Sequence, residues 1–401
     1  MTSFLAPFSG WIPAVSNPEQ VVTMSFEQYA KKEVQEICST QPHSYLHVVL
    51  PPEVRANGTL GFHDRNLASG RQLRTFMQEG VFTKTAPAYY LYQQVKGNKQ
   101  YTGLVAAVHV QALTSRLVLP HEETIAAREE KLTDYLDVVG INAEPVCLTF
   151  RDQLGIAQLW APLLAQTPDL DFSLGALGRH RLWVISDLVM VQQLSDKLNA
   201  INQWFIADGH HRTASSLRLA QQRQAHSSGG DQYFMASLFP EDMVDILPFH
   251  RMVKGLSDLV LSNFLSQLQE TFDILPISGQ PSSLALYFQG NWYHLSPKQP
   301  LAAQEIWAEI VSERILAPMF GIEDLRRDER VGFLGGVTQP EALVNAMEKG
   351  HFQIGFYLPA LSREDFFTYA QTGKYMPPKS TWFEPKLPNG LTMLDLQTSL
   401  G

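Results

Sequence analysis

Short apolar segments alternate along this chain with longer segments in which apolar residues recur every three or four positions. Runs such as Thr102–Val110 and Pro145–Phe150 are short and largely apolar and predict buried strands. A segment such as Leu67–Glu79 has the spacing of an amphipathic helix. Because both periods occur from one end of the chain to the other, the pattern predicts an α/β fold with mixed α+β sheets.

The same pattern places the other elements. Gly97-Asn98 is a turn pair that joins two of the predicted strands into a hairpin. The predicted strands are 45–50, 88–95, 102–110, 145–150, 181–185, 203–207, 233–239, 284–289, 292–295, 330–334 and 352–358. The predicted helices are 26–39, 67–79, 122–136, 186–200, 213–225, 302–320, 340–348 and 362–372.

The length of 401 residues favours two or three structural units, since a domain usually holds about 100–200 residues. We divide the sequence into an N-terminal α/β region (1–175), a central motif region (176–255) and a C-terminal α/β region (256–401). One continuous body is the alternative to this division.

Composition narrows the class of protein. Hydrophobic residues make up 45% of the chain and charged residues 18%, which is typical of a globular protein with a large core. The net charge of -9 argues against DNA or RNA as the main partner. No apolar run is long enough for a membrane span, and the N-terminus does not look like a secretory signal. With only Cys38 and Cys147 as cysteines, we expect a cytoplasmic protein that acts on a small molecule.

Candidate chemistry gathers in the segment Trp204–Ala220, where a strand ends in a glycine and a helix begins. The first N–H groups of a helix point out of its end and carry the positive pole of the dipole. Gly209 allows a close backbone approach, Arg212 offers a fork of donors, and His210, His211 and Thr213 add further polar groups. We interpret this turn as a phosphate-binding site, although it is not a Walker-type loop.

Two other interpretations of this segment remain open. The turn is also compatible with an ordinary strand-to-helix connection in which Asp208 caps the helix. Asp208 together with His210 and His211 contains the residue types that ligate metals, but adjacent histidines on a helix point in different directions.

Two more segments contain groups that suit such a site. Glu122, in His121–Thr124, is a candidate general base or Mg²⁺ ligand, or an acidic residue favoured at a helix start by the dipole. Lys379 and Lys386, in the non-periodic C-terminal segment, are candidates to neutralise phosphate charge. The alternative is a proline-stiffened segment that packs Trp382 and Phe383 on the core.

The chain resembles a large bacterial and archaeal family of unknown function, the DUF1015 family. Asp208–Ala214 (Asp-Gly-His-His-Arg-Thr-Ala) is similar to its signature. It differs at Pro18–Thr23, where relatives typically carry a Pro-Pro-Tyr-Asp-Val-like stretch, so the role of that segment is open. The other similar segments are Tyr45–Val49, Tyr101–Ala106, His121–Thr124, Asn142–Phe150, Phe333–Gly336 and Met376–Lys386.

The Gly-x-His-Arg core also resembles the nucleotide-phosphate motif of the ParB/sulfiredoxin superfamily, which includes free-serine kinases with an Asp-Gly-His-His-Arg sequence. This resemblance implies a ParB/sulfiredoxin-like strand-turn-helix core within a larger two-lobed body. It further implies that phosphates rest on Gly209, His210, His211 and Arg212. Sulfiredoxin carries a cysteine where this chain has His210, so sulfinic-acid repair is not expected.

These observations predict a phosphotransferase that uses ATP or ADP with Mg²⁺ and acts on a small hydroxylated metabolite, with free serine suggested by the kinase resemblance. Glu122, Asp208 and His211 are the expected catalytic residues, and Asp208 and Glu122 the expected Mg²⁺ ligands. Alternatives are a non-catalytic nucleotide or phospho-metabolite sensor and a metal-dependent hydrolase built on Asp208, His210, His211 and His121. A homodimer is compatible with all three.

Overall fold

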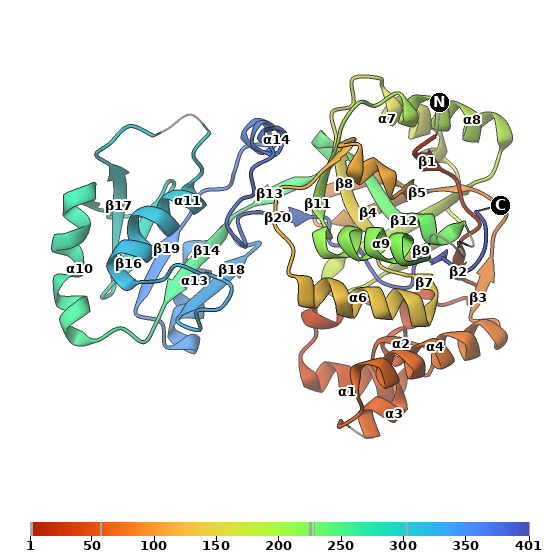
Figure 1. The fold of residues 1–401 in the computed structure, drawn as a ribbon, viewed down its shortest axis with the longest axis horizontal. Coiled ribbons are helices and arrows are strands. Elements are labelled where there is room, and N and C mark those ends of the chain that lie inside the picture. Colours follow the sequence, from red (N-terminus) through yellow and green to blue (C-terminus); the bar gives the residue numbers. More distant parts are fainter. Residues whose placement is uncertain (1–2, 57, 224–226, 228, 302–303, 401) are drawn as a thin grey trace. The chain divides into compact units, whose positions relative to one another are not determined.

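The chain forms two compact units in the computed structural model, which describes residues 3–56, 58–223, 227, 229–301 and 304–400. The first unit comprises residues 1–119, 124–244 and 385–401, and the second comprises 120–123 and 245–384. Figure 1 colours the elements along the sequence. The three-region division of the sequence stays a prediction, because it concerns stretches of chain rather than compact units.

A mixed sheet forms the centre of the first unit. Its described strands follow the order β6-β11-β8-β12-β5-β4-β10-β9, with β1 beside β5. The β12–β8 and β11–β6 pairs are parallel and the other pairs are antiparallel. The predicted hairpin is confirmed as β4–β5. The bounds are β1 Leu5–Ala6, β4 Tyr89–Lys96, β5 Lys99–His109, β6 Val118–Leu119, β8 Val146–Phe150, β9 Leu170–Ser173, β10 Arg179–Ile185, β11 Trp204–Asp208 and β12 Tyr233–Pro240.

Helices bury this sheet. Every residue of β8 is buried, which explains why the segment is a continuous apolar run rather than an alternating one. Helix α9 packs against β8 and β12, and α6 lies along α9 (Figure 1). The helices of this unit are α1 Lys31–Thr40, α2 Leu46–Val49, α3 Pro52–Ala56, α4 Phe62–Gln78, α5 Gln111–Thr114, α6 Ala126–Val139, α7 Ile156–Trp160, α8 Leu188–Asn199 and α9 His210–Arg223.

Two short strand pairs complete the first unit. One of them brings a C-terminal segment of the chain beside residues near position 140. The pairs are β2 Trp11–Pro13 with β3 Phe82–Lys84, and β7 Ile141–Asn142 with β21 Leu394–Asp395.

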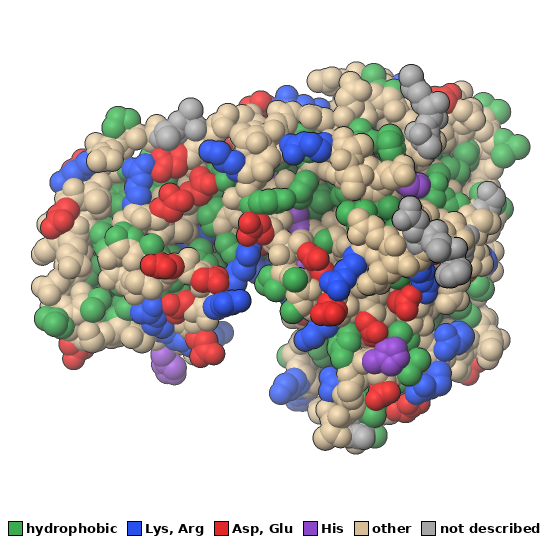
Figure 2. All heavy atoms as spheres, in the orientation of Figure 1, with side chains coloured by type: hydrophobic (Ala, Val, Ile, Leu, Met, Phe, Trp, Pro, Cys, Tyr) green, Lys and Arg blue, Asp and Glu red, His purple; other side chains and the backbone are tan. Residues whose placement is uncertain are grey.

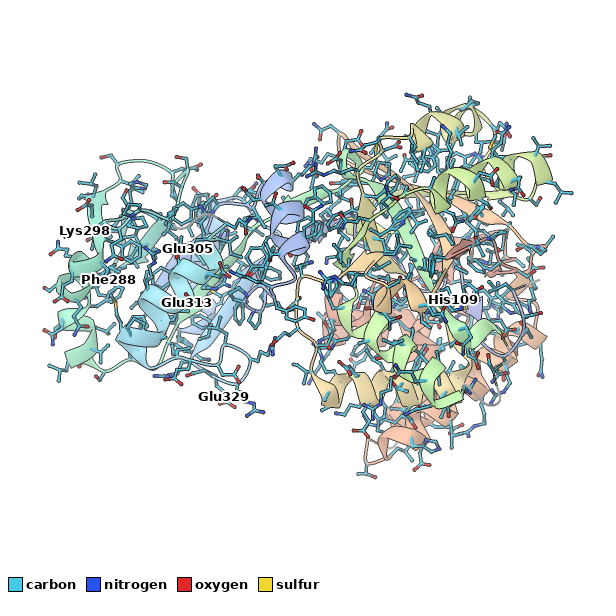
Figure 3. The ribbon with its side chains drawn as sticks, turned by 45° about the horizontal axis from the view of Figure 1, so that its top comes forward. His109, Phe288, Lys298, Glu305, Glu313 and Glu329 are labelled. Carbon is cyan, nitrogen blue, oxygen red and sulfur yellow. The ribbon has the colours of Figure 1, made fainter. Side chains whose placement is uncertain are left out.

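The second unit is built on an antiparallel sheet with the order β15-β17-β16-β19-β14-β18. Phe288 of this sheet, labelled in Figure 3, packs against Phe264 of α10, with 5.4 Å between the two ring centres. The strands are β13 Asp245–Leu247, β14 Phe249–Val253, β15 Phe272–Pro276, β16 Ala285–Phe288, β17 Asn291–Pro297, β18 Val331–Gly335, β19 Ile354–Tyr357 and β20 Trp382–Glu384, with β13 paired to β20.

The helices of the second unit include one interrupted helix. A π-helical turn at Ser312–Leu316 joins α11 to α12. The helices are α10 Asp258–Thr271, α11 Trp307–Val311, α12 Ala317–Phe320, α13 Pro340–Gly350 and α14 Arg363–Thr372.

The expected α/β fold with mixed sheets is confirmed, but several elements differ from the prediction. The helix predicted at 26–39 begins only at Lys31, after a separate 3-10 turn at Phe26–Gln28. Segment 45–50 is not a strand, because Leu46–Val49 forms one helical turn in an apolar cluster; a short apolar run does not distinguish a buried strand from a buried helix. Helix 122–136 begins only at Ala126, since Glu122 pairs with Met376 in a β-bridge. Within 302–320 the helix begins at Trp307, and residues 302–303 lie outside the described residues.

Charged side chains of both signs are interspersed on the face that Figure 2 draws. Among the described residues, no helix has both the length and the apolar character that crossing a membrane requires.

Candidate functional site

The predicted strand-turn-helix is present in the first unit. Strand β11 is buried from Trp204 to Ala207, and Gly209 follows it with φ +105°. Other residue types rarely adopt this conformation, so glycine permits the sharp turn. Helix α9 begins at once, and its first backbone bond runs 3.0 Å from the Thr213 N–H to the Gly209 carbonyl. The turn therefore has the local geometry of an anion-binding helix start.

Asp208, at the end of β11, lies at the centre of a charged cluster. Its Oδ2 is 3.3 Å from the Lys386 Nζ and 3.5 Å from the Arg212 Nη2. The other side of the Arg212 fork is 3.3 Å from Glu144 and donates to the Pro145 carbonyl at 2.5 Å. Arg212 is thus already engaged within the protein, and only 19% of its side chain is exposed.

The two cations determine the ionisation of Asp208. Desolvation would raise the pKa of its carboxyl group, but Lys386 and Arg212 outweigh this effect and hold the pKa well below its ordinary value. Asp208 is therefore a carboxylate at neutral pH, with 45% of its side chain exposed. Such a group is a good ligand for cations and a weak general base.

Cys147, on strand β8, is a neighbour of this cluster. Burial, together with a smaller contribution from the neighbouring Asp208 carboxylate, raises the pKa of its thiol to about 12. The thiol is buried and protonated, as expected for a small hydrophobic residue rather than a nucleophile.

The two adjacent histidines have different environments. His210 is buried, whereas His211 is partly exposed. The Nδ1 of His211 lies 3.4 Å from the Ile125 N–H and accepts from it, so the neutral ring carries its proton on Nε2. Consecutive helical positions thus point the two rings in different directions, as the sequence predicts.

Two candidate residues, Glu122 and Lys379, belong to the second unit. The Lys379 N–H lies 3.5 Å from the Glu122 Oε1, and the Lys379 ammonium lies 5.6 Å from the centre of the Phe249 ring. The adjacent His121 Nε2 is 3.0 Å from the Thr381 hydroxyl. The predicted site residues therefore fall into two groups, with Asp208–Thr213 and Lys386 in the first unit and Glu122 and Lys379 in the second.

Sequence reasoning missed Glu144 and the Pro145 carbonyl as partners of Arg212. Both lie in Asn142–Phe150, a segment singled out only for its resemblance. A carboxylate directly before a buried strand was the available signal, but the β8–β11 pairing that brings it to Arg212 is a tertiary feature.

No group of three or more His, Cys, Asp or Glu side chains is arranged to hold a metal ion within the described part of the chain. The metal-hydrolase alternative therefore has no ligand cluster among those residues. Asp208 with bound phosphates remains compatible with Mg²⁺, which commonly takes one or two carboxylates and completes its shell with water and phosphate oxygens.

The chain belongs to the DUF1015 family of proteins of unknown function, whose family model matches residues 5–315. The predicted membership is thereby confirmed. No curated protein sequence matches the chain.

Several solved structures are distantly similar. A free serine kinase in complex with AMP is 14% identical with a TM-score of 0.38, over 73% of this chain and 92% of the other. SbnI with a C-terminal truncation, from Staphylococcus aureus, is 12% identical with a TM-score of 0.41, over 74% and 87%. A conserved hypothetical protein from Pyrococcus furiosus is 13% identical with a TM-score of 0.37, over 74% and 96%. Similarity at this level does not assign an activity to the chain.

Proposed function

We propose that the turn Asp208–Thr213 binds the phosphate groups of ATP or ADP. We further propose that the protein transfers a phosphoryl group from the nucleotide to a small hydroxylated metabolite, with free serine as the first candidate. The observation that carries the proposal is the convergence of Arg212 and Lys386 on Asp208 at a strand-to-helix turn with a left-handed glycine.

Phosphate binding at this turn has specific requirements. Arg212 now pairs with Glu144 and Asp208, so a phosphate group must share or displace these carboxylates. The Nε2–H of neutral His211 is a donor that phosphate oxygens accept. The absent Cβ of Gly209 leaves room, since a Cβ there would lie 3.1 Å from the Arg212 Nε.

The transfer step needs little covalent chemistry from the protein. The substrate hydroxyl oxygen bonds to the terminal phosphorus, the bond to the leaving phosphate oxygen breaks, and the hydroxyl proton passes to a base or to water. Catalysis of such a step is mainly positioning and charge neutralisation, which Arg212 and Lys386 can supply. Mg²⁺, bound by Asp208 and phosphate oxygens, would add positive charge. Glu122 stays a predicted base, and no role is assigned to it in this turn.

The free serine kinases that the chain resembles distantly are named for this reaction. Their similarity is too low to carry the proposal, which rests instead on the charged turn.

A second candidate function is nucleotide binding without catalysis. The lowered pKa of Asp208 favours it, because a carboxylate held ionised by two cations accepts a proton poorly. A sensor needs the cations and the glycine turn but no base.

Calorimetric titration of the full chain with ADP and with ATP, each with Mg²⁺, tests the binding step. We expect saturable binding that Arg212→Ala and Lys386→Ala each weaken about tenfold or more, since each removes a charged donor. Arg218→Ala is the matched control: it lies on the same helix and pairs with Glu130 at 3.7 Å, away from Asp208. Nucleotide binding by the Arg212→Ala protein at wild-type affinity would contradict the proposal.

Phosphorus NMR of the wild-type protein with ATP or ADP and free serine separates the two candidates. A phosphoserine signal that depends on enzyme supports the kinase. Tight nucleotide binding without transfer to serine or to other hydroxylated metabolites supports the sensor instead.

A further inference from the structure

Arg251 is the most deeply buried charged side chain of the second unit. It lies on strand β14, and none of its surface is exposed. Its Nη1 donates to the Phe249 carbonyl at 3.1 Å, and its Nη2 reaches the Pro378 carbonyl at 3.4 Å. The guanidinium carbon lies 5.7 Å from the centre of the Phe333 ring. The group is therefore held by carbonyls and an aromatic ring.

The described residues include no counter-ion for the charge of Arg251. Within the described ranges of the chain, no carboxylate forms an ion pair with it, and its buried Nε has no hydrogen-bond partner. Burial lowers the pKa of the guanidinium to about 10, which still leaves it charged at neutral pH. An uncompensated buried charge is costly, so proteins normally pair one with an anion.

Comparison with other arginines of this chain shows which edge of the Arg251 guanidinium forms no ion pair. Arg179 binds Asp171 through Nε and Nη2 together, both at 2.6 Å. Arg330 uses the same edge for Asp328. In Arg251 this edge carries only the unpartnered Nε and the long contact to Pro378. It is the edge that takes two oxygens of a carboxylate or phosphate group.

A short turn, Pro377–Ser380, covers this edge. It is closed by a 2.6 Å bond from the Ser380 hydroxyl to the Pro377 carbonyl. Lys379 adopts φ +59°, a left-handed conformation that is uncommon outside glycine. Its exposed ammonium lies over the Phe249 ring, and Phe249 also supplies the carbonyl that Arg251 binds. The turn therefore brings a second cation to the residue that already holds Arg251.

Two of the contacts that hold this turn are long. Its contacts at Pro378 and at the Lys379 N–H are 3.4 and 3.5 Å long, near the limit for hydrogen bonds. Pro377 and Pro378 also line a cavity of about 420 Å³, so the turn has open space on one side. Carboxylates such as Glu309 and Glu313 line part of that cavity, so it does not itself suit an anion; Glu313 is labelled in Figure 3.

We propose that Arg251 and Lys379 form a binding site for an oxyanion, the carboxylate or phosphate group of a small ligand, beneath the turn Pro377–Ser380. Two oxygens of the ligand accept hydrogen bonds from the Nε and Nη2 of Arg251, and they replace the Pro378 carbonyl as the partner of Nη2. The Lys379 ammonium offsets the nearby Glu122 carboxylate, which accepts the Lys379 N–H. Glu384, which follows the turn in sequence, accepts a hydrogen bond from the Trp382 indole N–H at 3.2 Å.

Titration of the full chain with sodium acetate and with inorganic phosphate, at an ionic strength held constant with chloride, tests this site. The titrations are repeated on the Arg212→Ala protein, so that binding at the turn of the first unit is separated from binding here. We expect saturable binding of at least one anion in both proteins. Whichever of acetate and phosphate binds more tightly identifies the ligand group.

Arg251→Met keeps most of the side-chain volume and removes the charge. We expect it to weaken anion binding about tenfold or more, and Lys379→Met to weaken it several-fold. Arg327→Met is the matched control, because that side chain is 90% exposed on the same unit. Without anion, Arg251→Met should melt at the same temperature as wild type or higher, since an unpaired buried charge is gone.

Two results would overturn the site. One is the absence of saturable binding of either anion to the Arg212→Ala protein. The other is unchanged anion binding in Arg251→Met, which would leave Arg251 a purely structural residue. If Arg251→Met does not fold, Arg251→Lys serves instead: it keeps a charge but lacks the two-donor edge, and the same loss of binding is expected.

Discussion

Buried ionisable side chains differ in this protein according to whether a partner reaches them. Arg212 is compensated by Glu144 and Asp208, whereas the described partners of Arg251 are carbonyls and a ring rather than a carboxylate. His180 and His250 are buried and neutral, because burial lowers the pKa of each to about 4. The two arginines are therefore expected to affect ligand binding, and the two histidines the pH dependence of stability.

His180 offers a direct test of this dependence. It is fully buried; its Nδ1 lies 2.9 Å from the Tyr92 hydroxyl, and its Nε2 has no partner. The His180 ring takes up a proton near pH 6.5 in the unfolded chain, but only near pH 4 in the folded chain. The free energy of unfolding should therefore fall as the pH drops from about 6.5 to about 4, by up to about 3 kcal/mol from this residue.

Urea unfolding at pH 7.5, 6 and 5 measures this loss. His180→Gln, which cannot take up the proton, should show a clearly smaller decrease over the same range. His351→Gln, at an exposed position, is the control and should behave as wild type. Equal decreases in the His180→Gln and wild-type proteins would show that His180 is not the group responsible.

The unit of structure that carries the proposed function is the element pair β11–α9. A buried strand delivers Asp208 to the edge of the sheet, and Gly209 turns the chain so that the helix starts within one residue. Distant segments then complete the cluster. Glu144 lies just before β8 in the sequence, and Lys386 lies in the C-terminal part of the first unit. Neighbouring residues determine the shape of the turn, but residues distant in the sequence determine the balance of charges around it.

Gly209→Ala tests the turn at the level of the element. A side chain at φ +105° is strained, and its Cβ would lie 3.1–3.3 Å from the Arg212 guanidinium. We expect a loss of about 1–3 kcal/mol in the free energy of unfolding, together with weaker nucleotide binding.

The control for this variant is Gly97→Ala in the β4–β5 hairpin, where φ is +61° and no atom lies within 4 Å of the added Cβ. It should cost less stability and leave nucleotide binding intact. A Gly209→Ala protein as stable as wild type, with normal binding, would remove the special role of this glycine.

Each of the two units of the whole molecule has its own sheet and its own apolar interior. Leu148 is fully buried in the first unit, and Phe356 is fully buried in the second. Separate cores of this kind commonly unfold as separate cooperative transitions.

We therefore expect two transitions in differential scanning calorimetry of the full chain. Leu148→Ala should lower one of them and Phe356→Ala the other, with costs of about 2–5 kcal/mol for each cavity. If both variants instead lower one common transition by the same amount, the two units unfold as a single cooperative body.

Particular segments show how far the sequence could predict this fold. The Gly97-Asn98 hairpin and the strand-turn-helix at Gly209 were predictable because the residues at a turn dictate its geometry over a few positions. Segment 45–50 was predicted wrongly because its apolar run suits either a strand or a buried helical turn, and only the surrounding cluster decides between them.

The candidate site divides in the same way. By itself the sequence determined the α/β class, the family, and the glycine turn with its basic residue, since these depend on local pattern and residue type. The tertiary structure decided which charges meet: Lys386 reaches Asp208 across 178 positions, and Arg251 is buried against carbonyls rather than against a carboxylate of the described residues. Pairing of charges depends on strand order and on packing between distant segments, and no local pattern of residues encodes those distances.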